Sequence, residues 1–414
     1  MFLRQVTNLA ARRQGAVSSA AALRTFTSSN AVASAEHTYD ISGKFEVHND
    51  PFELGNCENP CEMPNEKPTA TREELMHALR EMLTIRRMEL TSDKLYKEQY
   101  IRGFCHLYDG QEAIASGLGA ALTDDDALIG TYRCHGHQLV RGGTVEGILA
   151  EMFGFKEGCS GGKGGSMHLY NKETNFYGGA GIVGAQVPLG AGLAFAAKYK
   201  QKEGELMNVG VTLYGDGAAN QGQNWEAANM SKLWGLPTVL VCENNKYGMG
   251  TSVDRHSSIT DYFKQGGVAI PGIRCDGMDY LAVRECFKYV KQYCGEGNGP
   301  IYVELNTYRY HGHSMSDPGT TYRDRTEIGD VRGSRDPIET VKRYLIEAGF
   351  AEEAELKAMA KEVTKEVNAA AKKAKAGSEP AMEELFTDVW TDGKGGSEIP
   401  KHVRMPNYEQ SIGV

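Results

Sequence analysis

The sequence predicts an α/β fold in which a central, mostly parallel sheet is flanked by helices, with extra helices at both ends of the chain. Two observations lead to this prediction. From about 109 to 320, glycine-rich turns alternate with short apolar runs and helical patterns, as in βαβ units. Four of the apolar runs also end in polar residues, as strands of open parallel sheets do at ligand sites. The 414 residues suffice for one large domain or two smaller ones.

The N-terminal segment has the composition of a mitochondrial presequence. Its first 35 residues hold four arginines, many serines and alanines, and no acidic residue. A disordered basic tail is the alternative interpretation. We expect a presequence over 1–26, because Arg24-Thr25-Phe26 resembles a processing site. An extended arm is expected over 27–70. The mature protein is then expected in the mitochondrial matrix.

The helices at the two ends of the predicted α/β domain have clear start signals. A capping box at Thr71-Arg72-Glu73-Glu74 predicts a helix that runs to about Tyr96. This helix opens a ligand-binding α/β domain over 71–335. Pro337, in a first helical position, begins C-terminal helices and a tail over 336–414, which we expect to pack on the same domain.

Charge, hydropathy and cysteine spacing exclude several classes of function. The net charge of −9 argues against a general nucleic-acid binder. No apolar run approaches the length that spans a membrane, so membrane insertion is not expected. The nine cysteines form no metal-binding pattern, because Cys57 and Cys61 lack a second pair at zinc-site spacing. In a reducing matrix they are expected to be free thiols.

Polar residues follow four predicted strands. The strands and the residues after them are 127–130 with Thr131-Tyr132-Arg133, 208–214 with Asp216, 236–242 with Asn245, and 300–307 with Tyr308-Arg309. Asp216 and Asn245 offer oxygen ligands that suit a hard cation such as Mg²⁺. The alternative is that Asp216 only caps a helix that starts near Ala218. The second polar side chain, at the end of another strand, favours the metal site.

The spacing of these residues resembles a known family. Gly215-Asp216-Gly217 and Asn244-Asn245 resemble the fingerprint of thiamine-diphosphate enzymes. From Arg86 to Asp336 the sequence also resembles the alpha subunits of thiamine-diphosphate-dependent 2-oxo acid dehydrogenases. It implies the thiamine-diphosphate-binding fold. It also implies that Asp216, Asn245 and the Tyr247 carbonyl hold Mg²⁺. The cofactor-binding residues that it implies are Tyr132, Arg133, Gly181, Val183, Asp216, Gly217, Ala218, Asn245, Tyr247, Arg309 and His313.

Several of these residues also have a chemical argument of their own. Arg133 and Arg309 can each give two parallel hydrogen bonds to a phosphate, although an arginine at a strand end is more often a surface ion-pair former. His106 and His313 are candidate acid–base groups because imidazole titrates near neutral pH. A structural histidine is the alternative. The resemblance implies active-site roles for both histidines, and places the backbone of Gly181 and Val183 beside the aminopyrimidine ring.

Two further patterns do not carry the chemistry that they suggest. The glycine-rich 161–166 lacks the first glycine and the Ser/Thr of a phosphate-binding P-loop, so we predict a flexible or close-approach loop. The pairs His135-x-His137 and His311-x-His313 resemble zinc ligands, yet neither has a third ligand at fixed spacing. Neither pattern is therefore assigned a ligand.

The resemblance also implies an activity and partners. Ala219 to Gln223 and Ser314 to Pro318 resemble the pyruvate branch of the family more than the branched-chain branch. That branch decarboxylates pyruvate oxidatively and transfers the acetyl unit to the lipoyl domain of a dihydrolipoamide acetyltransferase. A separate beta subunit supplies the glutamate that activates the cofactor, in an assembly of two alpha and two beta chains. This chain alone is then expected to be inactive.

Regulation is a further implication. Ser314 and Ser252 match serines that a dedicated kinase phosphorylates and a phosphatase restores, whereas Thr321 replaces the third serine. The polar stretch 310–330 is expected to form a mobile loop at the site entrance.

Two other functions stay open at this point. A self-contained thiamine-diphosphate decarboxylase would need a second cofactor-binding domain, for which the chain looks too short. A non-catalytic paralogue would be expected to have lost some of the residues named above.

Overall fold

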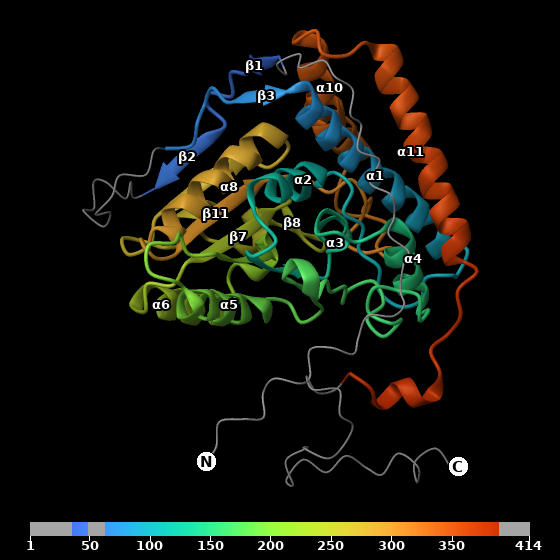
Figure 1. Ribbon diagram of the computed structural model, residues 1–414, viewed down its shortest axis with the longest axis horizontal. Coiled ribbons are helices and arrows are strands. Elements are labelled where there is room, and N and C mark those ends of the chain that lie inside the picture. The colour runs from blue at the N-terminus through green and yellow to red at the C-terminus, as the bar shows by residue number, and fades with distance from the viewer. Residues whose placement is uncertain (1–34, 49–62, 389–414) are drawn as a thin grey trace, which may run out of the picture. The chain divides into compact units, whose positions relative to one another are not determined.

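The computed structural model describes residues 35–48 and 63–388 (Figure 1). The predicted presequence, Cys57 and Cys61 lie outside these residues. The seven cysteines among them carry free thiols, as predicted. Within the described ranges, no helix combines the length and the apolar character needed to cross a membrane.

A seven-stranded sheet forms the centre of the fold, with strand order β2-β10-β11-β7-β6-β4-β5. Every neighbouring pair is parallel except β2 with β10, which is antiparallel, so the predicted mostly parallel sheet is confirmed. The strands are β2 Phe45–His48, β4 Ala127–Thr131, β5 Phe176–Ala180, β6 Gly210–Gly215, β7 Thr238–Asn244, β10 Gly272–Asp276 and β11 Ile301–Asn306. Because β4 and β7 are buried along their whole lengths, their runs 127–130 and 239–242 are apolar without alternation.

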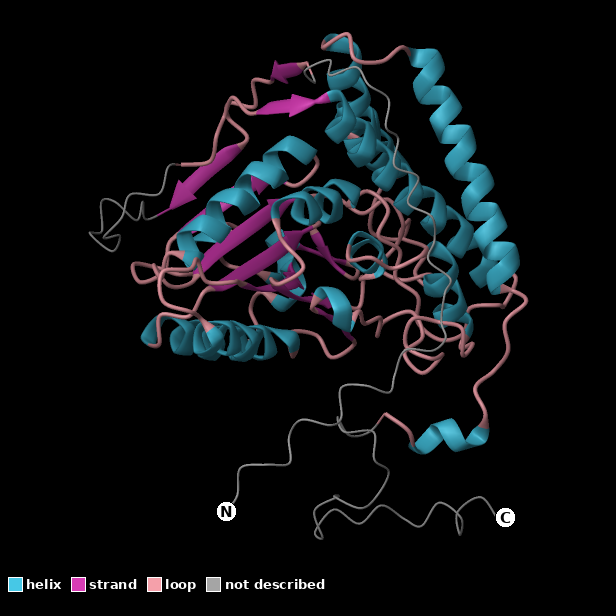
Figure 2. Cartoon of the chain, in the orientation of Figure 1, coloured by secondary structure: helices cyan, strands magenta, loops and turns pink. Residues whose placement is uncertain are grey.

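Helices cover both faces of this sheet (Figures 1 and 2). In these views α5 and α6 lie on one side, and α2 and α8 on the other, with α1, α10 and α11 beyond them. The α-helices are α1 Arg72–Lys97, α2 Glu112–Ala121, α3 His135–Val140, α4 Val145–Phe153, α5 Gln186–Lys200, α6 Gly222–Leu233, α7 Val253–His256, α8 Tyr280–Gly295, α9 Arg325–Arg335, α10 Pro337–Glu347 and α11 Glu353–Ala374.

Smaller elements complete the fold. They are the strand pairs β1 Glu36–Thr38 with β3 Thr69–Thr71 and β8 Tyr247–Gly248 with β9 Thr251–Ser252, and the 3-10 turns η1 Lys172–Thr174, η2 Asp216–Ala218, η3 Tyr262–Lys264 and η4 Met382–Phe386.

The predicted helix starts are confirmed. The Thr71 hydroxyl accepts a hydrogen bond from the Glu74 backbone N–H at 3.2 Å, which caps α1. The Asp336 carboxylate caps α10 by accepting from the Ile338 N–H at 2.9 Å, and Pro337 occupies the first turn. Near Ala218, however, the chain makes only the 3-10 turn η2, and the next α-helix begins at Gly222.

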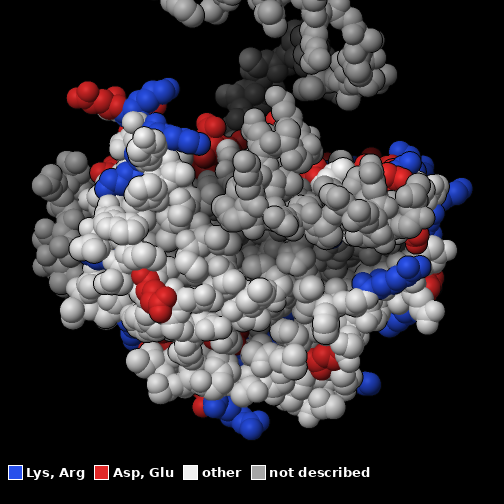
Figure 3. All heavy atoms as spheres, turned by 90° about the horizontal axis from the view of Figure 1, so that it is seen from below, with Lys and Arg blue, Asp and Glu red and all other residues white. Residues whose placement is uncertain are grey.

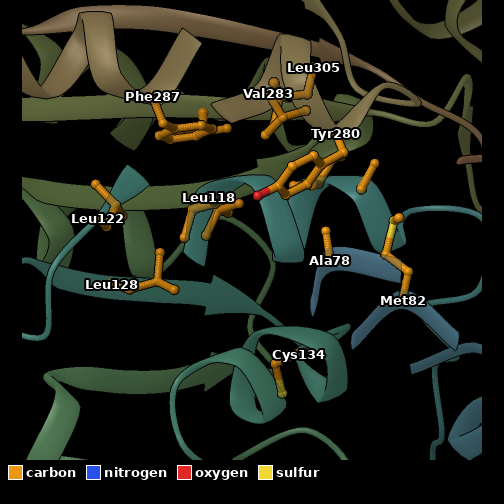
Figure 4. Packing of buried hydrophobic residues seen from close by; sticks show 14 of the residues in the cluster. Ala78, Met82, Leu118, Leu122, Leu128, Cys134, Tyr280, Val283, Phe287 and Leu305 are labelled. Atoms are coloured by element: carbon orange, nitrogen blue, oxygen red, sulfur yellow. The ribbon is translucent and has the colours of Figure 1, made fainter. Parts of the chain in front are cut away.

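The core lies between α2, α8 and the sheet. Figure 4 shows Leu118 of α2 between the side chains of α8 and Leu128 of β4. The two helices approach closely at Gly117, where a Cβ atom would lie 2.7 Å from Cβ of Val283. A larger residue there would push α8 away, so Gly117 sets the distance between the two helices.

Of the two predicted loops, 310–330 is wrong in part. The glycine-rich 161–166 is a close-approach loop, since a Cβ atom at Gly164 would lie 2.0 Å from the His168 carbonyl oxygen. The buried Glu151 carboxylate accepts hydrogen bonds from the backbone N–H of Ser160, Gly162 and Gly164 at 2.7, 2.9 and 2.7 Å. An internal carboxylate therefore orders this loop. In the predicted loop 310–330, helix α9 already begins at Arg325.

Candidate functional site

A cavity of about 390 Å³ lies at the carboxyl edge of the sheet. Its walls come from the ends of β4, β6 and β7, from the turn before α5 and from the loop after β11. The lining residues are Thr131, Tyr132, Arg133, Ala180, Val183, Gly184, Gln186, Gly215, Asp216, Gly217, Ala218, Asn220, Asn245, Tyr247, Gly248, Met249, Thr251, His256 and His313. This volume suits a small organic ligand or part of a cofactor.

The topology of the sheet places the cavity. After β4 the chain continues to β5 on one side of it, and then returns to β6 on its other side. The order of strands therefore reverses between β4 and β6, and open parallel sheets bind ligands in the crevice at such a switch point. The four strands that the sequence predicted to end in polar residues are the consecutive neighbours β11, β7, β6 and β4.

The three predicted metal ligands lie together at this edge. Asp216 and Asn245 are 1% and 8% exposed, and both line the cavity with Tyr247. Nη1 of Arg309 donates to Oδ1 of Asn245 at 3.3 Å and to the carbonyl oxygen of Tyr247 at 2.7 Å. Two of the three oxygens thus converge on a positive charge. With the nearby Asp216 carboxylate, this donor set fits a hard divalent cation.

Two buried arginines beside the cavity have no acidic partner. Arg133 and Arg309 are 4% and 1% exposed, and within the described ranges neither makes a salt bridge. Arg133 donates instead to the carbonyl oxygens of Leu107 and His313, the latter at 3.0 Å. Because buried positive charge is costly without a counter-charge, these residues fit an anionic ligand.

Arg309 is more constrained than the sequence suggested. Besides its bonds from Nη1, its Nη2 donates to the Met249 carbonyl at 2.7 Å and to the Tyr322 hydroxyl at 2.8 Å. Its Nε is buried and has no partner, and Arg309 is not among the residues that line the cavity. In this arrangement it acts on the cavity mainly through its charge and by fixing the Tyr247 carbonyl.

The two candidate histidines form an aromatic cluster with Tyr132. The His106 ring lies 4.3 Å from the Tyr132 ring and 5.2 Å from the His313 ring, centroid to centroid. Burial, with the charge of Arg133, lowers the pKa of His106 to about 2, and burial with Arg133 and Arg309 lowers the pKa of His313 to about 4. Both imidazoles are therefore neutral at pH 7.

Only one of these two histidines faces the cavity. His313 lines it, whereas His106 packs behind Tyr132 with its Nδ1 buried and without a hydrogen-bond partner. Gly217, Ala218 and Val183, which the resemblance implies as cofactor-binding residues, also line the cavity. Gly181 is not among the lining residues, although its neighbour Ala180 is.

Sequence reasoning missed several residues of the site. His256 lies 3.3 Å from Oδ2 of Asp216, and its hydrogen bond to this carboxylate raises the pKa of His256. Gln186, at the start of α5, is buried and lines the cavity. The buried residues Gln111 and Glu243 lie just behind Asn245. Only the position of Glu243 directly before the Asn-Asn pair could have singled it out.

The predicted phosphorylation sites have different surroundings. Ser314 is buried, and its hydroxyl lies 2.9 Å from that of Ser316. The turn around it is held by Asp317, whose carboxylate accepts from the His313 N–H at 2.6 Å. Ser252 is half-buried at the start of α7, and Thr321 is exposed.

Neither histidine pair forms a zinc site. Nδ1 of His135 lies 2.9 Å from the Glu89 carboxylate, and Nε2 of His137 lies 3.1 Å from the Tyr108 hydroxyl. His311 pairs with Asp109 at 2.6 Å. In the part of the chain that the structure describes, no cluster of three or more metal-ligating His, Cys, Asp or Glu side chains occurs.

Comparison with known proteins gives a consistent result. Residues 80–383 match the family model for the dehydrogenase E1 component. The chain is 54% identical to the pyruvate dehydrogenase E1 component subunit alpha-1, mitochondrial, of Oryza sativa subsp. japonica, over 80% of this chain and 84% of the relative. It is 52% identical to the corresponding somatic-form alpha subunit of Homo sapiens, over 86% of this chain and 89% of the relative.

The lowered histidine pKa values predict a pH-dependent stability. Between pH 6.5 and the lowered pKa, the unfolded chain binds a proton at His106 that the folded chain does not, so stability falls as the pH falls. From pH 7 to 5 this one group costs at most about 2 kcal/mol. Urea unfolding at both pH values is expected to show a smaller acid loss for His106→Gln than for the wild type. An equal loss would contradict the buried neutral imidazole.

Proposed function

The chain belongs to the dehydrogenase E1 component family, and we propose that the cavity beside Asp216 holds the diphosphate end of thiamine diphosphate. The chain takes part in the thiamine-diphosphate-dependent oxidative decarboxylation of pyruvate, as the alpha subunit of a pyruvate dehydrogenase E1 component. It is a mitochondrial protein, like these relatives and as its N-terminal composition predicts.

One observation supports this location above the others. The buried charges of Arg133 and Arg309 meet no carboxylate within the described ranges. A diphosphate would supply the counter-charge at the edge of the cavity that Arg133 lines. The backbone of Gly217 and Ala218, in the turn after β6, would lie beside the same group. Gly181 and Val183 are proposed to lie against the aminopyrimidine ring.

We further propose that Mg²⁺ accompanies the diphosphate. Its protein ligands would be the Asp216 carboxylate, Oδ1 of Asn245 and the carbonyl oxygen of Tyr247. All three are hard oxygen donors, and magnesium in such sites completes its coordination with water and phosphate oxygens. That two of them already face the Arg309 guanidinium is consistent with this role.

When bound, thiamine diphosphate supplies the electron sink for release of CO₂ from a 2-oxo acid. The chain's own residues are proposed to hold the cofactor and to handle protons. Burial, together with the charges of Arg133 and Arg309, lowers the pKa of His106 and of His313 and keeps both imidazoles neutral. A neutral imidazole accepts a hydrogen bond, so we propose that both act on the substrate side, His313 at the cavity wall and His106 behind Tyr132.

The alpha subunit works with a beta subunit, and the structure contains a surface suited to such a partner. Helix α5 is apolar on more than one face, and Leu189, Phe195 and Tyr199 are 59%, 51% and 84% exposed. The adjacent α6 exposes Trp225 and Leu233. Figure 3 shows few charged side chains across the middle of this face. We propose that it packs in an assembly of two alpha and two beta chains.

Other partners are proposed from the same family membership. They are the lipoyl domain of a dihydrolipoamide acetyltransferase, which would receive the acetyl unit, and a kinase and phosphatase that act on Ser314 and Ser252. Phosphate on Ser314 would not fit its buried position beside Asp317 unless the turn opened. Modification there would therefore disorder the site entrance and its contact with Arg133.

The two alternative functions are less well supported. Relatives that match over most of their length are named as subunits, which disfavours a self-contained decarboxylase. A non-catalytic paralogue is disfavoured because Asp216, Asn245, Arg133, Arg309 and His313 are all present and lie together at one edge of the sheet.

Removal of the Asp216 carboxylate tests the metal site. Asp216→Ala is expected to abolish Mg²⁺-dependent binding of thiamine diphosphate, because the only charged protein ligand is lost. Isothermal titration of the assembled enzyme with cofactor, with and without Mg²⁺, measures this. Asp254→Asn, at an exposed carboxylate of α7, is the matched control and should bind normally. Retained Mg²⁺-dependent binding in Asp216→Ala would refute the proposal.

Assembly with the beta partner tests the subunit function. Pyruvate-dependent release of CO₂ is expected only when this chain is co-purified with its beta subunit, since the cofactor-activating glutamate is proposed to come from that subunit. Leu189→Glu and Phe195→Glu should prevent co-purification while the chain stays folded, because they place charge in the apolar face. Activity in the lone chain would contradict the shared site.

A charge at position 314 tests the regulatory proposal. Ser314→Glu is expected to reduce turnover by roughly tenfold or more, because a carboxylate cannot replace the buried hydroxyl beside Asp317. Ser314→Ala should stay close to wild type, and Thr321→Glu, at an exposed side chain, should change turnover little. Steady-state rates of the assembled enzyme decide this. Equal rates for Ser314→Glu and wild type would exclude the charge effect.

A further inference from the structure

A buried series of hydrogen bonds leads from the interior of the protein to a proposed metal ligand. The Glu243 carboxylate accepts from the Tyr108 hydroxyl at 2.8 Å and from Nε2 of Gln111 at 3.4 Å, and lies 3.4 Å from Nε2 of His137. Oε1 of Gln111 in turn accepts from Nδ2 of Asn245 at 3.1 Å. Gln111 is completely buried, so its amide has no access to water at either end.

The position of Gln111 is not explained by the fold alone. It is the residue that precedes α2, where a short side chain would normally bond to the free backbone N–H groups. The Gln111 side chain makes no such bond. It extends instead toward Asn245 at the end of β7. The chain therefore buries a polar side chain at a helix start without the usual gain in helix stability.

The donor and acceptor atoms of these groups fix the direction of the hydrogen bonds in this series. Nε2 of Gln111 is the end of the amide that donates to the Glu243 carboxylate oxygen. The carbonyl end of Gln111 must then face Asn245, and it requires the NH₂ end of that side chain. Oδ1 of Asn245 is consequently left pointing toward Nη1 of Arg309 at the metal edge of the site. A flipped Asn245 amide would present donors to a cation.

We propose that Gln111 is a positioning residue that links Glu243 to Asn245 by hydrogen bonds, and so holds the oxygen of Asn245 toward the metal. The proposal rests on the metal site proposed above. Gln111 is not among the residues that line the cavity, and acts only through the orientation of one amide. Outer-sphere hydrogen bonds of this kind commonly change metal affinity by roughly 10- to 100-fold.

The test measures Mg²⁺ affinity rather than activity. In the enzyme assembled with its beta subunit, the free Mg²⁺ concentration that gives half-maximal binding of thiamine diphosphate is measured by titration calorimetry, with the thermal midpoint of the cofactor-free assembly alongside. Gln111→Met keeps the length of the side chain and removes both ends of the amide. It is expected to raise that Mg²⁺ concentration by roughly 10- to 100-fold. Gln138→Met, at a buried glutamine bonded to the Tyr170 carbonyl, is the control and should not change it.

A second mutant background distinguishes a lost orientation of the Asn245 side chain from a general loosening of the site. Asn245→Asp presents an oxygen whichever way its carboxylate turns, so the additional effect of Gln111→Met there is expected to fall below about twofold. A loss that stays as large in this background would overturn the proposal, as would unchanged Mg²⁺ affinity in Gln111→Met. Should Gln111→Met fail to assemble, Glu243→Leu decides, since it removes the oxygen that accepts from Gln111. An unchanged Mg²⁺ affinity there would also overturn the proposal. Absence of Mg²⁺-dependent binding in the wild type would instead refute the metal site itself.

Discussion

The parallel register of β11, β7, β6 and β4 is the constraint on which the site depends. Gly215 of β6 pairs with Glu243 of β7, and Asn244 pairs with Asn306 of β11. The residues that follow these strands therefore leave the sheet at nearly the same level and on the same edge. Because the pairing is set by buried apolar strands, it brings a carboxylate, an amide and two arginines from distant parts of the sequence to one edge, where Arg309 also donates to Asn245.

The site concentrates positive charge on buried arginines that make no salt bridge to a carboxylate within the described residues. Arg133 and Arg309 bond to backbone carbonyls and to a tyrosine hydroxyl instead of carboxylates. Arg323 behaves alike, donating to the carbonyl oxygens of Arg309 and His311 at 2.7 and 2.6 Å. Carbonyl groups satisfy the donors but leave the charge in place, so the chain holds a positive field ready for an anion. Burial lowers the pKa of His106 and of His313, and the charges of Arg133 and Arg309 lower them further.

Local patterns in the sequence were sufficient to predict the four strand ends and the helix starts at Thr71 and Pro337, because each depends on neighbours along the chain. Residues that act through distant contacts were missed. Gln111 and Glu243 lie far apart in sequence, and their importance follows from burial and a shared hydrogen bond. The role of Glu151 in ordering the loop 161–166 was missed for a similar reason, since it lies outside the motif. Strand β5 was not predicted, because it contains two glycines, which are uncommon in strands.

The contacts of Arg133 connect cofactor binding to order at the site entrance. One nitrogen of its guanidinium holds the His313 carbonyl at 3.0 Å, while the side chain lines the cavity. His313 directly precedes Ser314, and its N–H is held by Asp317. A ligand that fixes Arg133 therefore also stabilises the 313–317 turn, and by linkage an ordered turn raises affinity for that ligand. Opening of the turn by phosphate would act in the reverse direction. The proposed regulation and the proposed cofactor binding would thus share one side chain, and would need no separate relay through the fold.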